Sequence, residues 1–444
     1  MNNPAQDSYQ LYIGGEWVDA SDGATLDSFC PATGEKLSTI ADATREDVDR
    51  AVEVAWKAFE TWGKTDKTER AAILNKVADI IEENAEKLAL LETLDNGKPI
   101  RETRAIDIAY SVDHFRYFAG VLLADTGEAD ILPGNMMSLV LHEPIGVVGQ
   151  IVPWNFPFLM AAWKLAPVLA AGDCTVFKPS STTSLSVLEF AKLTQDVIPA
   201  GVFNVITGKG SKSGQYLLEN QRISKLAFTG STEVGRDVAR AAADRLIPAT
   251  LELGGKSANI IFPMRSGIWL SMVYSWVFYS IRVRYAVRAV EFFVHEDIYD
   301  KFVEDAVAAF NKVKVGMPWE DDTQMGSQID ERQMNKILGY IDIAKQEGGK
   351  VLCGGERYTE GECAKGAFLK PTMIEVPNNS CRCAQEEIFG PVAVVIKFKD
   401  EQEVIDMAND SVYGLGGAVW TRDINRAFRV APVSYTHLTL PTKA

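Results

Sequence analysis

The chain has 444 residues, of which 47% are hydrophobic and 24% are charged, and its formal net charge is −15. This length allows two or three domains of ordinary size, and the composition is that of a soluble globular protein rather than a disordered one. The acidic balance argues against a nucleic-acid partner, because a polyanion is bound through a basic face.

The cysteines and the apolar runs narrow the class further. Six cysteines are too sparse for a disulfide framework, and the close pair Cys381 and Cys383 stands in a chain with four histidines, so we predict no metal site. The first residues show neither the basic region nor the apolar core of a secretory signal, which predicts a cytoplasmic protein. The uncharged run 266–281 is shorter than the roughly 20 residues of a membrane-spanning helix.

The N-terminal part of the chain carries structural signals. Two short apolar runs around a Gly-Gly pair in 11–18 are typical of a hairpin. Thr44 precedes apolar residues at helical spacing that continue to Trp62, and Asp47 three residues later completes a capping arrangement. Further amphipathic helices are predicted at 70–93 and 103–122.

From residue 145 onward strands alternate with helices, which is the signature of a mainly parallel sheet covered on both faces. Strands are predicted at 146–152, 174–177, 202–206, 226–228 and 250–253, and helices at 158–170 and 184–197. A second mixed pattern follows, with helices at 298–313 and 331–346 and strands at 350–353, 391–396 and 418–420. The chain is therefore predicted to be α/β, with a Rossmann-type doubly wound sheet first and a second α/β domain after it.

The residues that follow each strand are the candidates for a ligand site, because doubly wound sheets bind ligands at the carboxyl ends of their strands. Lys178 suits a phosphate or a ribose hydroxyl, although a surface lysine remains an alternative. Asn155 suits an oxyanion, although a turn asparagine is the commoner explanation. Gly230 and Ser231 open a helix that could face a phosphate, but the Gly-x-Gly-x-x-Gly pattern is missing and the signal is weak.

Glu252 stands between two leucines and is followed by two glycines. A carboxylate that is desolvated in an apolar run has a raised pKa and suits a general base. The alternative is an amphipathic strand that ends in a turn, with Glu252 in water. The local sequence leaves both interpretations open.

Taken together with Glu-Glu-Ile-Phe-Gly-Pro at 386–391, these motifs occur in the order found in NAD(P)-dependent aldehyde dehydrogenases, which the chain resembles over roughly residues 10–430. The resemblance implies oxidation of an aldehyde to a carboxylic acid through addition of a cysteine thiolate, hydride transfer to NAD or NADP, and hydrolysis of a thioester. It also implies an NAD(P)-binding domain over 1–250, an oligomerisation hairpin around 123–143, a catalytic domain over 251–430, and a homo-oligomer.

The resemblance also implies roles for single residues. Asn155 would stabilise the oxyanion and Glu252 would activate the hydrolytic water. The implied cofactor-binding residues are Ile151, Pro153, Trp154, Lys178, Ser181, Gly210, Gly230, Ser231, Leu253, Glu387 and Phe389. Among them Lys178 would contact the adenosine ribose, Gly230 and Ser231 the pyrophosphate, and Glu387 with Phe389 the nicotinamide ribose. Ser181 stands where many NAD-preferring members have a carboxylate, so NAD and NADP both remain possible.

The nucleophile position departs from the family. The family places its cysteine about 34 residues after the general base, and here that offset falls on Ala286, between Cys174 and Cys353 with no cysteine in the interval. The stretch 264–292 is unlike the family although both flanks match it, and codons that encode 280–289 can be read one base out of frame as Asn-Gln-Gly-Gln-Val-Cys-Cys-Ala. We therefore expect a compensated frameshift and negligible activity, with non-catalytic nucleotide binding as the alternative function.

The resemblance also stops near Val430, and residues 431–444 are expected to be an unrelated tail. The family continues there with a glycine-rich loop and a final strand that pairs subunits. We expect a truncated catalytic domain and impaired assembly.

Overall fold

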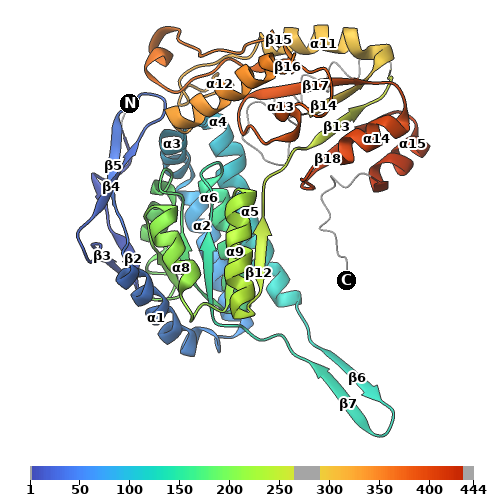
Figure 1. Ribbon diagram of the computed structural model, residues 1–444. Helices are drawn as coiled ribbons and strands as arrows, with labels where there is room; N and C mark the ends of the chain where they lie inside the picture. The colour runs from blue at the N-terminus through green and yellow to red at the C-terminus, as the bar shows by residue number, and fades with distance from the viewer. Residues whose placement is uncertain (1–2, 265–290, 434–444) are drawn as a thin grey trace. The chain divides into compact units, whose positions relative to one another are not determined.

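The computed structural model describes residues 3–264 and 291–433, which belong to two compact units (Figure 1). The first unit comprises Met1–Cys30, Glu35–Asn96 and Ile100–Glu252, and the second comprises Pro31–Gly34, Gly97–Pro99 and Leu253–Ala444. Each unit contains its own sheet. Among the described residues, none of the helices combines the length and the hydrophobicity needed to span a bilayer.

The predicted N-terminal hairpin is confirmed as β2 (Leu11–Ile13) paired antiparallel with β3 (Glu16–Val18). Gly14 and Gly15 have φ of +68° and +86°, a turn conformation that a side chain would strain. A separate three-stranded sheet of this region was not predicted; its strands are β1 (Ser8–Tyr9), β5 (Lys36–Ala41) and β4 (Thr25–Phe29), in that order.

The helix α1 (Arg45–Trp62) begins at the predicted capping box. The Thr44 hydroxyl accepts a hydrogen bond from the Asp47 N–H at 3.3 Å, and the Asp47 carboxylate accepts one from the Thr44 N–H at 2.9 Å. Two of the N–H groups that a helix start leaves unsatisfied are paired in this way. The apolar face that starts at Val48 is buried, as its spacing predicts.

Both long helices predicted next are interrupted. The first is α2 (Lys67–Glu83) followed by α3 (Ala85–Asn96), because Asn84 ends α2 and its side chain donates to the Ile80 carbonyl at 2.8 Å. The second begins as α4 (Ile100–Glu102) and a π-helical turn (Thr103–Ile108) before α5 (Ala109–Ala124). In that turn the Thr103 hydroxyl donates to main-chain carbonyls, which competes with the regular helical pattern.

The main sheet of the first unit has the strand order β12-β11-β8-β9-β10-β2-β3. Its first five strands are mutually parallel: β8 (Val147–Ile151), β9 (Cys174–Lys178), β10 (Phe203–Val205), β11 (Lys225–Thr229) and β12 (Ala249–Glu252). The helices between them are α6 (Pro157–Ala171), α7 (Leu185–Thr194), α8 (Gln215–Glu219) and α9 (Thr232–Arg245). Because the order runs outward from β8 in both directions, the predicted doubly wound sheet is confirmed, with its switch point between β8 and β11.

The strands β6 (Glu128–Leu132) and β7 (Met136–Val140) form a separate antiparallel hairpin that projects from the first unit (Figure 1). All ten strand residues are exposed. Gly134 and Asn135 in the turn have φ of +85° and +62°. The hairpin lies within the segment 123–143.

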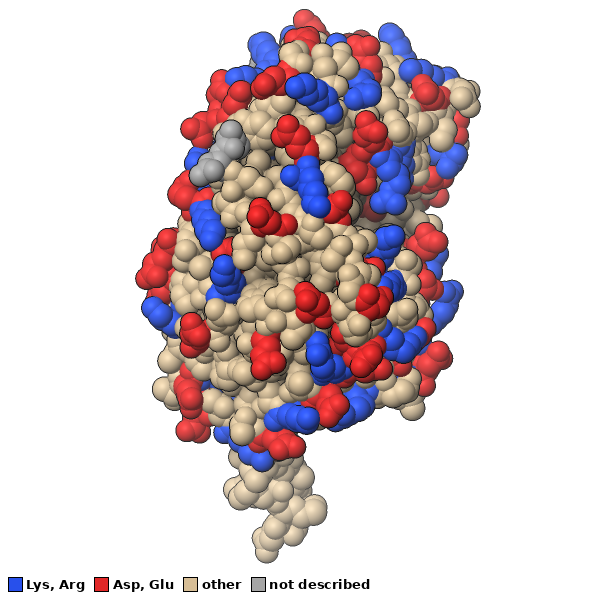
Figure 2. Space-filling model, turned by 90° about the vertical axis from the view of Figure 1, so that its left-hand side faces the viewer, with Lys and Arg blue, Asp and Glu red and all other residues tan. Residues whose placement is uncertain are grey.

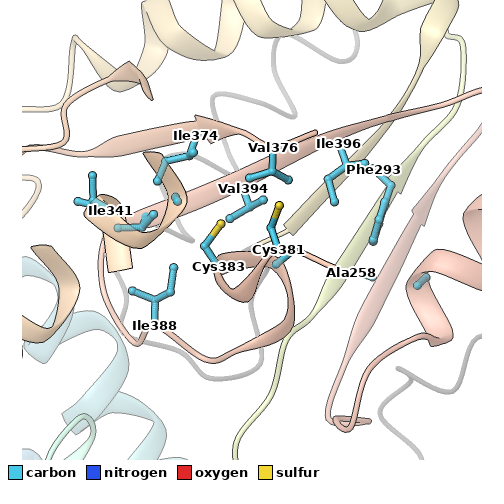
Figure 3. Close-up of a cluster of buried hydrophobic side chains, with 14 of the residues drawn as sticks. Ala258, Phe293, Ile341, Ile374, Val376, Cys381, Cys383, Ile388, Val394 and Ile396 are labelled. Atoms are coloured by element: carbon cyan, nitrogen blue, oxygen red, sulfur yellow. The ribbon is translucent and has the colours of Figure 1, made fainter. Parts of the chain in front are cut away.

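The second unit contains a six-stranded sheet in the order β15-β16-β17-β14-β13-β18, parallel except at β15. Its strands are β13 (Ala258–Ile261), β14 (Glu291–His295), β15 (Lys350–Cys353), β16 (Thr372–Glu375), β17 (Val392–Phe398) and β18 (Gly417–Trp420). The helices are α11 (Glu296–Phe310), α12 (Glu331–Gln346), α13 (Arg382–Gln385), α14 (Glu401–Asn409) and α15 (Ile424–Val430). The sheet packs into an apolar cluster that includes Phe293, Ile374 and Val394 (Figure 3). This is the predicted second α/β fold.

Two short segments from the N-terminal part of the chain belong to the second unit. The Ala367 N–H donates to the Pro31 carbonyl at 3.1 Å. Gly97 has φ of +83°, and a Cβ there would lie 2.3 Å from the Ser327 hydroxyl oxygen, so only glycine fits. Residues early and late in the chain are therefore in direct contact within this unit.

The stretch 264–292, which is unlike the family, is described only at residue 264 and at residues 291 and 292. Glu291 and Phe292 are the first residues of β14 and pair with Ala258 and Asn259 of β13. The position Ala286, the rest of the expected frameshift, and the tail from residue 434 lie outside the described residues.

Candidate active and cofactor-binding site

Three strands of the first sheet end side by side where the strand order reverses. Ile151 of β8 is paired with Lys178 of β9 on one side and with Phe228 of β11 on the other. The residues that follow these strands therefore lie at one edge of the sheet. Ser231 caps α9 there by accepting a hydrogen bond from the Val234 N–H at 3.3 Å, so the free N–H groups and positive end of a helix are held at this edge.

Lys178 is buried at the end of β9, with 3% of its surface exposed. Its ammonium donates to the Pro179 carbonyl at 2.9 Å, and burial lowers its pKa to about 8, although Asp42 acts in the opposite direction. The alternative of a surface lysine is therefore wrong. Among the described residues, the Pro179 carbonyl is the one acceptor of the Lys178 ammonium. Two of its three N–H groups therefore remain for hydroxyl or phosphate oxygens, as a dinucleotide ribose would require.

Asn155 is 7% exposed and lies in the bend between β8 and α6. This bend is fixed from both sides: the Asn96 side chain donates to the Trp154 carbonyl, and the Phe158 N–H donates to Glu92 at 3.1 Å. The amide is thus mounted on a rigid segment. A segment held in this way suits a group whose orientation must be fixed before the reaction.

Glu252 is the last residue of β12, the edge strand of the described sheet, and its main-chain carbonyl accepts from the Gly230 N–H at 2.9 Å. Its side chain is half-buried, so the complete desolvation expected of an acid in an apolar run is not observed. The reason is the edge position, which leaves Ala249 and Thr250 exposed. The alternative, in which Glu252 is fully in water, is not observed either, because the side chain is only partly exposed.

Lys164 was missed by the sequence analysis. It is 8% exposed in α6, burial lowers its pKa to about 8, and the charge of Glu252 acts in the opposite direction. A lone charge within the apolar helix Pro157–Ala171 was the signal that could have found it. The carboxylate of Glu252 therefore has a buried cation within electrostatic range.

The other implied residues of the first unit differ in exposure. Pro153, Trp154, Ser181 and Gly230 are half-buried, whereas Gly210 and Ser231 are exposed. Gly210 starts a π-helical turn after β10, and Gly214 in that turn lies against the Lys178 side chain: a Cβ there would be 3.5 Å from the lysine carbons. The turn therefore covers the lysine.

The implied residues Leu253, Glu387 and Phe389 belong to the second unit. Glu387 is half-buried, its carboxylate accepts from the Gly255 N–H at 3.4 Å, and burial raises its pKa. Phe389 has φ of +57°, an uncommon conformation for a non-glycine residue, and its carbonyl accepts from the Gln333 side chain at 2.9 Å. Leu253 is half-buried two residues before Gly255.

All six cysteines are described, and none of them forms a disulfide. Burial raises the pKa of Cys174 to about 12 and the pKa values of Cys353 and Cys383 to about 11, so few of these thiols are ionised at neutral pH. Cys381 and Cys383 lie in the apolar cluster of the second unit (Figure 3). No group of three or more histidine, cysteine or acidic side chains poised for a metal occurs in 3–264 or 291–433.

These features define a doubly wound α/β protein of the nucleotide-binding type. The model of the aldehyde dehydrogenase family matches residues 17–434. An aldehyde dehydrogenase of Vibrio cholerae serotype O1 is 45% identical over 449 aligned positions, which cover 96% of this chain and 85% of that protein. The chain therefore belongs to the aldehyde dehydrogenase family.

Solved structures agree with this assignment. The NAD+ complex of an aldehyde dehydrogenase from Bacillus cereus has a TM-score of 0.92 at 39% identity and covers 96% of this chain and 87% of that chain. A betaine aldehyde dehydrogenase from Staphylococcus aureus, also with NAD+, has a TM-score of 0.92 at 38% identity and covers 96% and 85%. The aldehyde-dehydrogenase-like fold implied by the sequence is thereby confirmed.

Proposed function

We propose that the protein binds NAD or NADP and that its family reaction is the oxidation of an aldehyde to a carboxylic acid. The observation that carries the proposal is the buried Lys178 ammonium, which keeps N–H groups to donate at the switch point of a doubly wound sheet. Two similar aldehyde dehydrogenases whose solved structures contain NAD+ support the proposal. Bound NAD or NADP would supply the acceptor for the aldehyde hydride.

The residues of the first unit would divide the remaining work. Lys178 would donate to a ribose hydroxyl, and Gly230 with Ser231 would turn main-chain N–H groups toward the pyrophosphate. Asn155 would donate its amide N–H to the substrate oxygen as negative charge develops there. Glu252 would take a proton from the hydrolytic water, and the Lys164 ammonium lies within electrostatic range of that carboxylate.

Within the second unit, Glu387 and Phe389 would bind the nicotinamide ribose, and Leu253 would contact the cofactor. Covalent chemistry requires a thiol at the nucleophile position, where this chain has Ala286. A second candidate function is therefore nucleotide binding without catalysis. The raised pKa values of the buried cysteines favour it for this chain.

The partner we propose is a small-molecule aldehyde, and we propose no nucleic acid. The net charge is −15, and on the face in Figure 2 basic and acidic side chains are interspersed. We propose a cytoplasmic location, because six cysteines that form no disulfide fit a reducing compartment.

Titration with the two cofactors tests the proposal. We expect calorimetry to give a Kd between about 1 µM and 1 mM for at least one of NAD+ and NADP+, the usual range for enzyme ligands. Ser181→Glu should weaken NADP+ by about tenfold or more and affect NAD+ less, because a carboxylate repels the 2'-phosphate. Failure of both cofactors to bind at millimolar concentration would refute the proposal.

We also propose that the chain forms a homo-oligomer through the β6–β7 hairpin. The register pairs Ile131 with Met137 and Ala129 with Leu139, so these four residues share one wholly apolar face. Ile131, Met137 and Leu139 are 79%, 66% and 60% exposed. The other face is mixed: it carries the polar residues Glu128, Asp130 and Ser138 together with the apolar residues Leu132, Met136 and Val140. A second copy of this ribbon is the occupant we propose for the apolar face.

Charge on this face is expected to break the assembly. Ile131→Glu with Leu139→Glu should reduce the mass measured by light scattering to that of one chain, because two carboxylates cannot be buried together in an apolar contact. Ser138→Glu on the opposite face is the matched control and should leave the mass unchanged. A wild-type chain that is already monomeric at micromolar concentration would contradict the proposal.

A further inference from the structure

The segment before and through Glu387 is attached to a buried lysine of the same unit. Lys256 is 2% exposed, and its ammonium donates to the main-chain carbonyls of Cys383 at 2.6 Å and of Glu386 at 3.0 Å. Cys383 lies within α13 and Glu386 directly precedes Glu387. One side chain therefore ties the short helix to the residue next to the proposed cofactor ligand (Figure 3 shows Cys383 and Ile388 on this loop).

Neighbouring contacts fix the remaining freedom of the loop. The Gly255 N–H donates to the Glu387 carboxylate at 3.4 Å, immediately before Lys256. The Glu386 carboxylate instead accepts from Tyr340 at 2.7 Å and from Arg382 at 2.8 and 3.0 Å. The two adjacent carboxylates are thus directed to different partners. Beyond them Gln333 of α12 donates to the carbonyls of Ile388 and Phe389 at 3.3 and 2.9 Å.

The Lys256 ammonium has a buried counter-charge. Glu291 is 4% exposed on β14, and burial, the largest effect on each group, lowers the pKa of Lys256 and raises the pKa of Glu291. Each charge opposes the effect of burial on the other. The other titratable groups that face Lys256 are Cys383, Glu386 and Glu387, which also favour its charged form.

We propose that Lys256 is a positioning residue of the cofactor site, which holds the main chain of 383–387 so that the Glu387 carboxylate keeps one orientation, and that Glu291 retains the ammonium there. The inference rests on the proposed function, in which Glu387 binds the nicotinamide ribose. Without the ammonium, the carbonyls of Cys383 and Glu386 lose this donor, and the loop must be ordered when the cofactor binds.

Lys256→Met keeps an unbranched side chain, one atom shorter than that of lysine, and removes the N–H groups. We expect the Kd for the cofactor to rise about tenfold, and amide hydrogen exchange at 386–389 to accelerate by about tenfold or more, because a charged hydrogen bond is lost at each carbonyl. Lys345→Met, at an exposed lysine of α12, is the control and should change neither value. A folded Lys256→Met chain with wild-type affinity and wild-type exchange overturns the inference.

The unpaired Glu291 charge can prevent the single variant from folding. Lys256→Met combined with Glu291→Gln removes that charge and should show the same fast exchange; slow exchange overturns the inference. Should the wild-type chain bind neither NAD+ nor NADP+, the proposed function fails, and hydrogen exchange alone decides whether Lys256 positions the loop.

Glu291→Gln alone gives a pH readout that a purely structural role would not move. Removing the carboxylate lowers the pKa of Lys256 further, so the ammonium is lost at a lower pH than in the wild type. We expect amide hydrogen exchange at 386–389, corrected for its intrinsic pH dependence, to accelerate at a lower pH in the Glu291→Gln chain than in the wild type. Identical profiles of exchange rate against pH for the two chains would show that Glu291 does not retain the ammonium.

Discussion

The purified chain is expected to form no NADH from an aldehyde above the background of the reagents. The nucleophile position is Ala286. The thiols of Cys174 and Cys383 are buried, that of Cys353 is half-buried, and all three have raised pKa values. Replacing 281–288 with Asn-Gln-Gly-Gln-Val-Cys-Cys-Ala restores a cysteine at position 286. We expect the rate of NADH formation, followed by absorbance, to rise on the order of 10⁴-fold or more, since loss of a nucleophile costs at least that much in covalent enzymes.

The matched control carries the same segment with serine at position 286 and should stay near background. NADH production by the unaltered chain that saturates with aldehyde and disappears with a thiol reagent would contradict the prediction. Resequencing of the DNA tests its origin: we expect one base lost near codon 264 and one regained near codon 292. An intact reading frame there would leave the altered stretch as the native sequence of the protein.

Lys178→Met is expected to stabilise the fold and to weaken cofactor binding at the same time. The folded pKa of about 8 lies below the ordinary value of 10.5, so the unfolded chain binds more protons between these values. Below pH 8 the buried ammonium therefore costs roughly 3 kcal/mol, and this cost decreases as pH rises through 8 and vanishes above 10.5. The variant removes the cost, and it also removes the N–H groups meant for ribose.

Urea unfolding of both chains at pH 7, 8.5 and 10 measures this effect. The gain in unfolding free energy should be largest at pH 7 and shrink at each step, while the Kd for NAD+ or NADP+ rises by about 10- to 100-fold. The difference between variant and wild type cancels the titration of the buried cysteines. Lys192→Met, at an exposed lysine of α7, is the control. Equal stability of the variant and the wild type at pH 7 would contradict the burial of a charged Lys178.

The parallel strands of the first unit were predictable because buried parallel strands are continuous apolar runs. The strands β4 and β5 were missed because their sequences are largely polar, and much of β4 is exposed. The break at Asn84 was missed because apolar spacing continues across it, from Ile81 to Leu88. Periodicity reports which side is buried, and it contains no information about a break in the backbone hydrogen bonds.

The motifs of the site could be predicted from the sequence, but the burial and the charge partners of each site residue could not. A surface lysine remained an alternative for Lys178 because a single sequence does not say which strands flank β9. The burial of Glu252 stayed open because the sequence does not say that β12 is an edge strand. The pair of Lys256 and Glu291 was invisible, since the parallel pairing of β13 with β14 creates it from residues 35 positions apart.

The segments 31–34 and 97–99 affect how the chain is made. Gly97 leaves the ribosome about 230 residues before Ser327, and Pro31 precedes Ala367 by still more. At ordinary translation rates the first interval lasts roughly 10 to 50 seconds. During that time the strands β8–β12 are synthesised and can pair, whereas the contacts of the two segments with Ser327 and Ala367 cannot yet form. A nascent chain therefore presents two open loops to chaperones and proteases until its last third has been translated.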